Sequence, residues 1–224
     1  MQNILSNIII SVNKKLFVKN PESTELGKKI IENSIILIDE IGFENFTFKK
    51  LGERINSNES SIYRYFESKH KMLLYLSSWY WGWIEYKLAF ATINIDNPIE
   101  RLKRGIIVVT EKIEDDVITL HVNESILNKI IIQEFTKTLL TKEVDDENKE
   151  GFFLVYKRVI NRIVEMIQDV NPNYEYAKSL ASSIVEGSLH QHFLMNHLTT
   201  ITNCNDENKP SDFYLDLISI LLKK

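Results

Sequence analysis

The sequence predicts an all-α protein, and three observations predict this fold class. Only 7 glycines and 4 prolines interrupt 224 residues, whereas a β-protein of this size needs many more turns. Apolar residues recur every three or four positions over long stretches, which is typical of helices with one buried face. The chain is 44% hydrophobic and 26% charged, so it can bury a core. The frequent isoleucines favour strands, but periodicity is the stronger signal.

The first helix is expected to start near Asn20, after an N-terminal extension of residues 1–20. Asn20 or Ser23 can cap this helix, and Pro21 suits its first turn. Gly42 is expected to end it, because glycine adopts the left-handed conformation that follows many helices. Its buried stripe comprises Ile30, Ile31, Ser34, Ile35, Ile38 and Ile41.

Two short helices separated by a turn should follow. Thr47 is placed to cap the first, and Asn56, in the segment 56–58, breaks the helical period. Asparagine is the non-glycine residue that best tolerates a left-handed turn. Ser68 is then placed to cap a long helix from Lys69 to about Thr92. Further helices are expected at 98–113, 119–141, 149–170, 173–198 and 210–223.

The cellular compartment is inferred from what the sequence lacks. The single cysteine, Cys204, cannot form an internal disulfide, which favours a reducing compartment. The apolar start, 1–12, has no preceding basic region and no small-residue cleavage site, so we expect no signal peptide. No run of 18 apolar residues occurs, so no membrane span is expected. The sequence predicts a cytoplasmic protein.

Positive charge is concentrated near the predicted short helices, although the whole chain has a net charge of −4. Between residues 45 and 72, six basic residues face three acidic ones, a net +3 that leaves −7 for the rest. A specific DNA-binding protein can have such a basic module on an acidic body; the alternative is a chance imbalance in a short segment. Lys14, Lys15 and Lys19 form a second basic cluster, either an arm for the DNA minor groove or a solvated tail.

The segment 43–76 has the organisation of a helix-turn-helix, in which the second short helix fits the major groove. Ile62 and Phe66 would face the core, together with Phe48 and Leu51 of the first short helix. The exposed face of the second helix would carry Asn58, Glu59, Ser60, Ser61, Tyr63 and Arg64.

These residues resemble the signature of the tetracycline-repressor (TetR) family of transcriptional regulators. The resemblance rests on Thr47-Phe48, Leu51, the run from Ser60 to Lys69, and Leu73. It implies domains at 21–70 (helix-turn-helix, DNA-binding) and 71–224 (helical, effector-binding and dimerisation). The chain departs from the family pattern at Asn56, where glycine is usual, and at Glu59, whose carboxylate is unfavourable near DNA unless it accepts from a cytosine amino group.

The resemblance also implies roles for individual residues. Thr47, Tyr63 and Lys69 would bind phosphates, which fixes the register on DNA. Asn58, Glu59, Ser60, Ser61 and Arg64 would lie nearest the base edges. Simpler roles stay open for three residues: Tyr63 could serve packing alone, Lys69 could be solvated, and Glu59 could be an exposed acid favoured by the helix dipole.

The rest of the chain contains no catalytic or phosphate-binding motif, so we expect no enzymatic activity and no cofactor. A helical enzyme is the first rival interpretation. His190, His192 and His197 share one predicted helix, but their spacing does not suit a metal site. No metal is expected.

An aromatic stripe on the long helix suggests an effector site. Trp79, Trp83, Tyr86 and Phe90 share one helical face, whereas Trp81 points elsewhere. Such a stripe is more often core, but in the TetR family the inner face of this helix helps to line the effector pocket. A small, mainly apolar effector would suit such residues.

Two later helices suggest a homodimer interface. Ser179, Ser183 and Gly187 are spaced by four and would let a partner helix approach closely. The preceding helix offers an apolar row: Phe152, Val155, Val159, Ile163, and Ile167 or Met166. The alternative is a groove for a helix of the same chain.

Together these features predict a dimeric regulator, a repressor of transcription that binds a palindromic double-stranded DNA operator and is released by an effector. Movement of the long helix would shift the recognition helices. The alternative is a helical ligand-binding or protein-interaction module of the same fold that has lost DNA binding.

Overall fold

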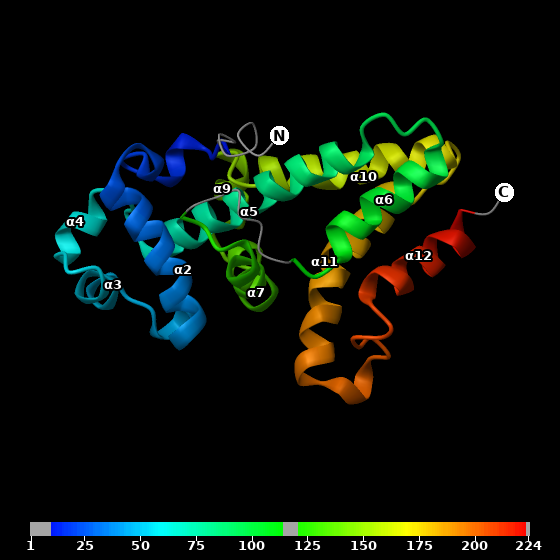
Figure 1. Ribbon diagram of the computed structural model, residues 1–224. Coiled ribbons are helices and arrows are strands. Elements are labelled where there is room, and N and C mark those ends of the chain that lie inside the picture. Colours follow the sequence, from blue (N-terminus) through cyan, green and yellow to red (C-terminus); the bar gives the residue numbers. More distant parts are fainter. Residues whose placement is uncertain (1–9, 114–120, 223–224) are drawn as a thin grey trace. The chain divides into compact units, whose positions relative to one another are not determined.

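The computed structural model describes residues 10–113 and 121–222. Within these ranges every regular element is a helix (Figure 1), which confirms the predicted fold class. The apolar start at 1–9 and the first two residues of the helix predicted over 119–141 lie outside the described residues. Contacts divide the chain into unit 1, residues 1–82 and 113–154, and unit 2, residues 83–112 and 155–224. No described helix is long and apolar enough to span a membrane.

Unit 1 begins with two short 3-10 turns, η1 (Lys14–Leu16) and η2 (Pro21–Ser23), before the helix α2 (Glu25–Asn45). The predicted helix start was therefore early: Asn20 caps only η2, and the Thr24 hydroxyl accepts from the Gly27 amide to cap α2. Gly42 has φ +75°, as expected for the end of a helix, but one more helical turn follows this kink.

The helices α3 (Phe48–Arg54) and α4 (Glu59–Tyr63) form the predicted helix-turn-helix. Thr47 caps α3 through a 3.2 Å hydrogen bond from the Lys50 amide. Asn56 has φ +52°, the left-handed turn that its residue type predicted. The turn is tight, because the Ser57 amide donates to the Gly52 carbonyl at 2.8 Å.

Unit 1 also contains α7 (Glu124–Glu134), α8 (Thr136–Leu139) and α9 (Val144–Lys149). The helix predicted over 119–141 is thus two helices in its described part, joined at Phe135. Helix α7 packs against α2. The core of unit 1 consists of fully buried apolar side chains such as Ile30, Ile35, Phe46, Leu51, Ile62, Phe66 and Leu73.

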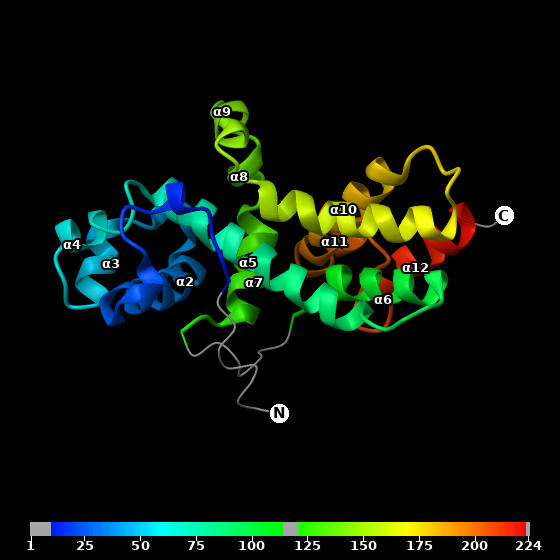
Figure 2. The same cartoon turned by 90° about the horizontal axis from the view of Figure 1, so that it is seen from above.

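The long helix α5 (Lys69–Thr92) has the predicted bounds and is capped by Ser68, whose hydroxyl accepts from the Lys71 amide at 3.1 Å. The boundary between the two units falls within it. Unit 2 continues with α6 (Pro98–Thr110), α10 (Leu154–Val170, whose first residue lies in unit 1), α11 (Ala177–His197), η3 (Thr199–Ile201) and α12 (Pro210–Leu221). Helix α6 packs against α11 and α12 (Figure 2).

The predicted dimer surface is only partly available. The apolar row Phe152, Val155, Val159, Ile163, Met166 and Ile167 is buried within the single chain. Gly187 lies against Tyr214 of α12, so closely that a Cβ at Gly187 would be 2.2 Å from the tyrosine hydroxyl oxygen. For these residues the alternative, packing within the same chain, is correct. Ser179 and Ser183 are exposed, and the homodimer itself stays a prediction.

Candidate nucleic-acid interface

Helix α4 presents the face that the sequence predicted. Ile62 and Phe66 are completely buried, whereas Asn58, Glu59, Ser60 and Arg64 are exposed and Ser61 is half-buried. The apolar side chains hold this five-residue helix against the core, so its polar face is directed to solvent. Exposure of short polar groups and a cation beside a tight turn is what major-groove recognition requires.

Tyr63 combines a packed ring with an available hydroxyl. Its ring contacts Phe48 edge-on, with the centroids 5.0 Å apart, and half of the residue is exposed, 50%. The hydroxyl forms no hydrogen bond with any residue that the structure describes, so it is free to donate to a phosphate oxygen. Thr47 is also exposed; its oxygen accepts from Lys50, which leaves its hydroxyl proton available.

Two of the predicted base-contacting residues are bonded to each other. The Asn58 side-chain oxygen accepts from the Ser61 amide at 2.8 Å and from the Ser61 hydroxyl at 2.7 Å. This cap orders the first turn of α4 but occupies the Asn58 acceptor. Glu59, Ser60 and Arg64 form no such bond with described residues. They are the better candidates for base edges.

The basic residues of the module divide into those held internally and those that are unpaired. The Arg54 guanidinium donates to Glu40 at 3.0 Å and to Asn33 at 3.3 Å; the hydrogen bond from Arg54 lowers the pKa of Glu40. Lys50 donates to the Asn45 carbonyl at 2.9 Å. The Lys71 ammonium lies 3.9 Å from the centre of the Phe152 ring.

Lys49 and Arg64, by contrast, are exposed and form no ion pair or hydrogen bond within the described parts of the chain. Lys49 is a candidate DNA-binding residue that the sequence reasoning missed. The signal was present: Phe48, Leu51 and Ile55 mark the buried face of α3, which leaves Lys49 on the opposite face.

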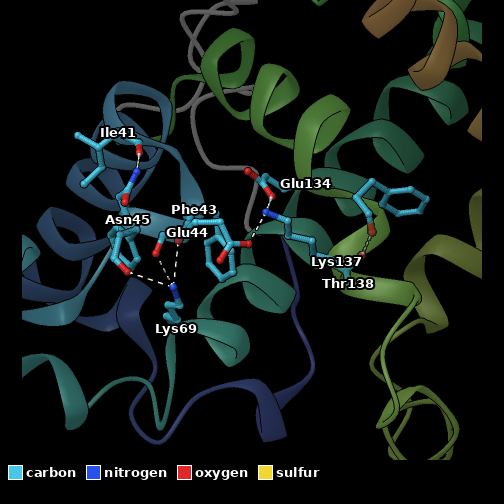
Figure 3. A network of polar contacts seen from close by, with 10 residues as sticks. Ile41, Phe43, Glu44, Asn45, Lys69, Glu134, Lys137 and Thr138 are labelled. Carbon is cyan, nitrogen blue, oxygen red and sulfur yellow. Dashed lines mark hydrogen bonds and ion pairs between the residues drawn. The ribbon is translucent and has the colours of Figure 1, made fainter.

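Lys69 has a structural role that the sequence did not indicate (Figure 3). Its ammonium donates to the carbonyls of Phe43 at 3.1 Å, Glu44 at 3.1 Å and Phe46 at 3.3 Å. These carbonyls end α2, where backbone acceptors lack helical partners and a cation is favoured by the helix dipole. All three ammonium protons are thus used within the chain. The proposed phosphate contact of Lys69 stays a prediction, to be tested against this role.

A second cation reinforces the same end of α2. The Lys137 ammonium lies 2.6 Å from a carboxylate oxygen of Glu44 and 2.7 Å from one of Glu134 (Figure 3). Burial opposes the charge on Lys137, but the hydrogen bonds to Glu134 and Glu44 raise its pKa overall. Helix α2 is therefore tied to α8 by an ion pair and to α7 by packing.

The proposed effector residues differ in exposure. Trp79 and Trp83 are buried, Tyr86 is half-buried, and Phe90 is 60% exposed. The Lys87 ammonium lies 4.5 Å from the centre of a Trp83 ring, and the Tyr86 and Phe90 rings are 4.6 Å apart. Exposure of Phe90 means that an aromatic surface in unit 2 is available for contact.

A buried polar pair in unit 1 was also missed. Asn128 of α7 donates to the Tyr80 hydroxyl at 2.9 Å, and both residues are buried. Burial raises the pKa of Tyr80, so the phenol stays neutral. The signal in the sequence was weak, because Tyr80 and Asn128 are 48 residues apart.

The histidines of α11 do not assemble into a metal site. His192 is buried and donates to the Thr110 carbonyl at 2.8 Å, whereas His190 and His197 are exposed. Among residues 10–113 and 121–222, no three His, Cys, Asp or Glu side chains lie together as metal ligands would.

One comparison with known protein families gives a match, and it covers the helix-turn-helix segment. Residues 30–76 match the sequence model described as "Bacterial regulatory proteins, tetR family". No curated protein sequence matches the chain.

Three solved structures share the fold. AibR, in complex with isovaleryl coenzyme A and operator DNA, has a TM-score of 0.55 and 17% identity, over 86% of this chain and 96% of AibR. The superantigen PfiT has a TM-score of 0.59 and 13% identity, over 92% and 100%. The ketosteroid transcriptional regulator KstR2 of Mycobacterium tuberculosis has a TM-score of 0.54 and 14% identity, over 96% and 97%.

The fold carries more than one function among these relatives, so the assignment depends on the matched segment. That segment contains the end of α2, the whole helix-turn-helix and the start of α5. The match over residues 30–76 shows that the helix-turn-helix segment is similar to the tetR family of bacterial regulatory proteins, and the solved structures show that the chain shares its all-helical fold with AibR, PfiT and KstR2.

Proposed function

We propose that this protein is a cytoplasmic transcription repressor that binds a palindromic operator as a homodimer and is released by a small, mainly apolar effector. The observation that carries the proposal is the exposed polar face of α4, with the Tyr63 hydroxyl and Arg64 unpaired beside the Thr47 cap. Thr47, Tyr63 and Lys49 would bind phosphates, and Glu59, Ser60 and Arg64 would approach base edges.

A homodimer would present two recognition helices to the two halves of a palindromic operator. A five-residue recognition helix contacts few base pairs, so one module alone binds weakly. Two modules spaced by about 34–36 Å would place their recognition helices in successive major grooves of a palindrome. The exposed serines of α11, Ser179 and Ser183, stay candidates for the partner contact.

The effector would act through α5. This helix starts with Lys69, beside the end of α2, and carries Trp79, Trp83, Tyr86 and Phe90 further along. A coupling of about 1–3 kcal/mol between effector and operator binding is typical of such systems. AibR was solved with isovaleryl coenzyme A, and KstR2 is described as a ketosteroid transcriptional regulator. We therefore propose to begin the search for an effector among acyl and polycyclic compounds.

The test is selection of bound sequences from random double-stranded DNA, followed by fluorescence anisotropy on the enriched sequence. We expect a palindrome, and Tyr63→Phe should weaken its binding without changing the free energy of unfolding. Lys49→Met should also weaken binding, whereas Lys178→Met, an equal charge change on exposed α11, should not. Enrichment of no sequence would refute the proposal.

The release step is tested on the same DNA with fractionated metabolites. Phe90→Ala removes an exposed ring, so it should keep the fold and operator binding while reducing the response to the releasing compound. An unchanged response would remove Phe90 from the effector site.

The second candidate function is a protein-interaction module of the same fold that does not bind DNA. The structural similarity to the superantigen PfiT supports it. That candidate predicts a folded protein that binds no duplex even at low salt, where phosphate contacts are strongest.

A further inference from the structure

The stretch Asn13–Lys19, here called the N-terminal strap, lies outside the segment 30–76 that matches the family. The strap is ordered by its own contacts: Asn13 caps the turn η1 by accepting from the Lys15 amide at 3.0 Å, and Leu16 is 1% exposed. A solvated tail would have neither feature. The question is therefore what the strap holds.

One end of the strap is bound to the turn that follows α9. The Asn13 side-chain amide donates to the Glu150 carbonyl at 2.9 Å, and the Lys15 ammonium pairs with the Glu150 carboxylate. The next residue, Gly151, has φ +81°, and a Cβ there would lie 3.4 Å from the Asn13 amide nitrogen. The strap thus fits closely against this turn.

The other end of the strap is bound to the residue just beyond the recognition helix. The Val18 amide donates to the Tyr65 carbonyl at 2.8 Å, and the Lys19 ammonium lies 5.3 Å from the centre of the Tyr65 ring. Phe17 meets Tyr75 edge-on, with centroids 6.1 Å apart. Helix α4 ends at Tyr63, only two residues before Tyr65.

A helix of five residues has little stability of its own, because too few backbone hydrogen bonds offset the entropy of ordering it. Its orientation depends on the packing of Ile62 and Phe66 against the core and on the contacts at its ends. The Asn58 cap fixes its start, and the bond from Val18 fixes the chain at its end.

We propose that the N-terminal strap positions the recognition helix, by tying the end of α4 to the α9–Gly151 turn, and thereby sets operator affinity. This inference rests on the proposed operator binding. If the strap is loosened, the end of α4 must be ordered when DNA binds, and that ordering weakens the complex. The strap lysines need not touch DNA for this effect.

The first experiment cuts the bond at Tyr65 without changing charge. Val18→Pro removes the amide proton; Phe17, before it, has φ −142° and ψ 152°, which the residue before a proline accepts. Val18→Ala keeps the proton and is the matched control, since this side chain is 60% exposed. Val18→Pro should bind the selected operator about three- to tenfold more weakly than Val18→Ala, with the same dependence on salt. Equal affinities would overturn the proposal.

The second experiment uses the sign of an electrostatic effect. Glu150→Gln breaks the pair with Lys15 and removes a negative charge, which by electrostatics alone should strengthen binding to DNA. If the strap positions α4, Glu150→Gln should instead weaken binding to the operator. Glu143→Gln, an equal charge change on an exposed residue at the start of α9, is the control. Glu150→Gln binding as tightly as Glu143→Gln, or more tightly, would show that the strap does not position α4.

A DNA-free measurement separates failure of this inference from failure of the proposed function. Amide hydrogen exchange over residues 59–66 should be faster in Val18→Pro than in Val18→Ala. If the wild-type protein binds no duplex, the proposed function fails while exchange still reports on the strap. If the wild type binds and neither exchange nor affinity distinguishes the two variants, the strap alone is disproved.

Discussion

Replacing Lys69 by methionine distinguishes its structural role from the phosphate role that the family resemblance implies. Methionine keeps the length of the side chain but removes the ammonium group. Three carbonyls at the end of α2 then lose a donor: those of Phe43, Glu44 and Phe46. Water can replace the lost donor at Glu44, whose bond is exposed, more easily than at the two part-buried carbonyls.

The magnitude follows from these two part-buried bonds. Each contributes about 1 kcal/mol net, so Lys69→Met should lower the free energy of unfolding by about 2 kcal/mol. For a chain of this length, that corresponds to a fall in Tm of about 4–8 °C. The loss would appear without DNA, in thermal or urea unfolding followed by circular dichroism.

The salt dependence of operator binding supplies the other half of the test. A lysine that neutralises one phosphate contributes about 0.9 to the slope of log K against log salt concentration. Lys49→Met, an equal charge change at an exposed and unpaired position, should reduce the slope by about this amount and leave stability within about 0.5 kcal/mol. Lys69→Met should instead lower the free energy of unfolding and leave the salt slope unchanged. If Lys69→Met leaves the stability unchanged and reduces the slope, the structural role of Lys69 is refuted and its phosphate contact is supported.

Three further predictions concern stability. Asn56→Ala should lower the free energy of unfolding by about 1 kcal/mol, because φ is +52° there and alanine tolerates that conformation poorly; Asn56→Gly should not, and urea unfolding of the pair decides. Gly187→Ala places a Cβ 2.2 Å from the Tyr214 hydroxyl oxygen and should destabilise by about 1–3 kcal/mol; adding Tyr214→Phe should restore most of the loss, and a double variant no better than the single one would contradict the clash. Burial, opposed by the bond to Thr110, holds the pKa of His192 below its usual 6.5, so below about pH 6.5 the unfolded chain takes up a proton that the folded chain excludes. The free energy of unfolding should therefore fall as the pH drops through this range, by at most about 1.4 kcal/mol per pH unit for this group; His192→Gln, compared at pH 7.5 and 5.5, should show a smaller fall than the wild type.

The features that the sequence predicted correctly are mostly local ones. Thr47, Asn56 and Ser68 act within a few residues of themselves, as caps or in a turn, so their residue type and position were sufficient. The same holds for the buried face of α4, because helical spacing alone places Ile62 and Phe66 together. The start of α2 was placed too early because Asn20 and Thr24 are both good caps, and sequence alone does not rank them.

The features that the sequence did not predict depend on distant partners. Lys69 bonds carbonyls 23 to 26 residues away, and Lys15 pairs with a glutamate 135 residues away. Both looked like surface cations suited to DNA or solvent. The apolar row of α10 was ambiguous for a related reason: periodicity shows that a helix face is covered, but not whether the cover belongs to the same chain.

The sorting of cations in the helix-turn-helix has a consequence for how such a regulator finds its target. Of the six basic residues between 45 and 72, all within the described part of the chain, only Lys49 and Arg64 remain unpaired. Attraction to duplex DNA of arbitrary sequence scales with the phosphates neutralised, so a module with two unpaired cations should adhere only weakly to such DNA. If the protein binds an operator as proposed, little of it would then be held on other duplex DNA.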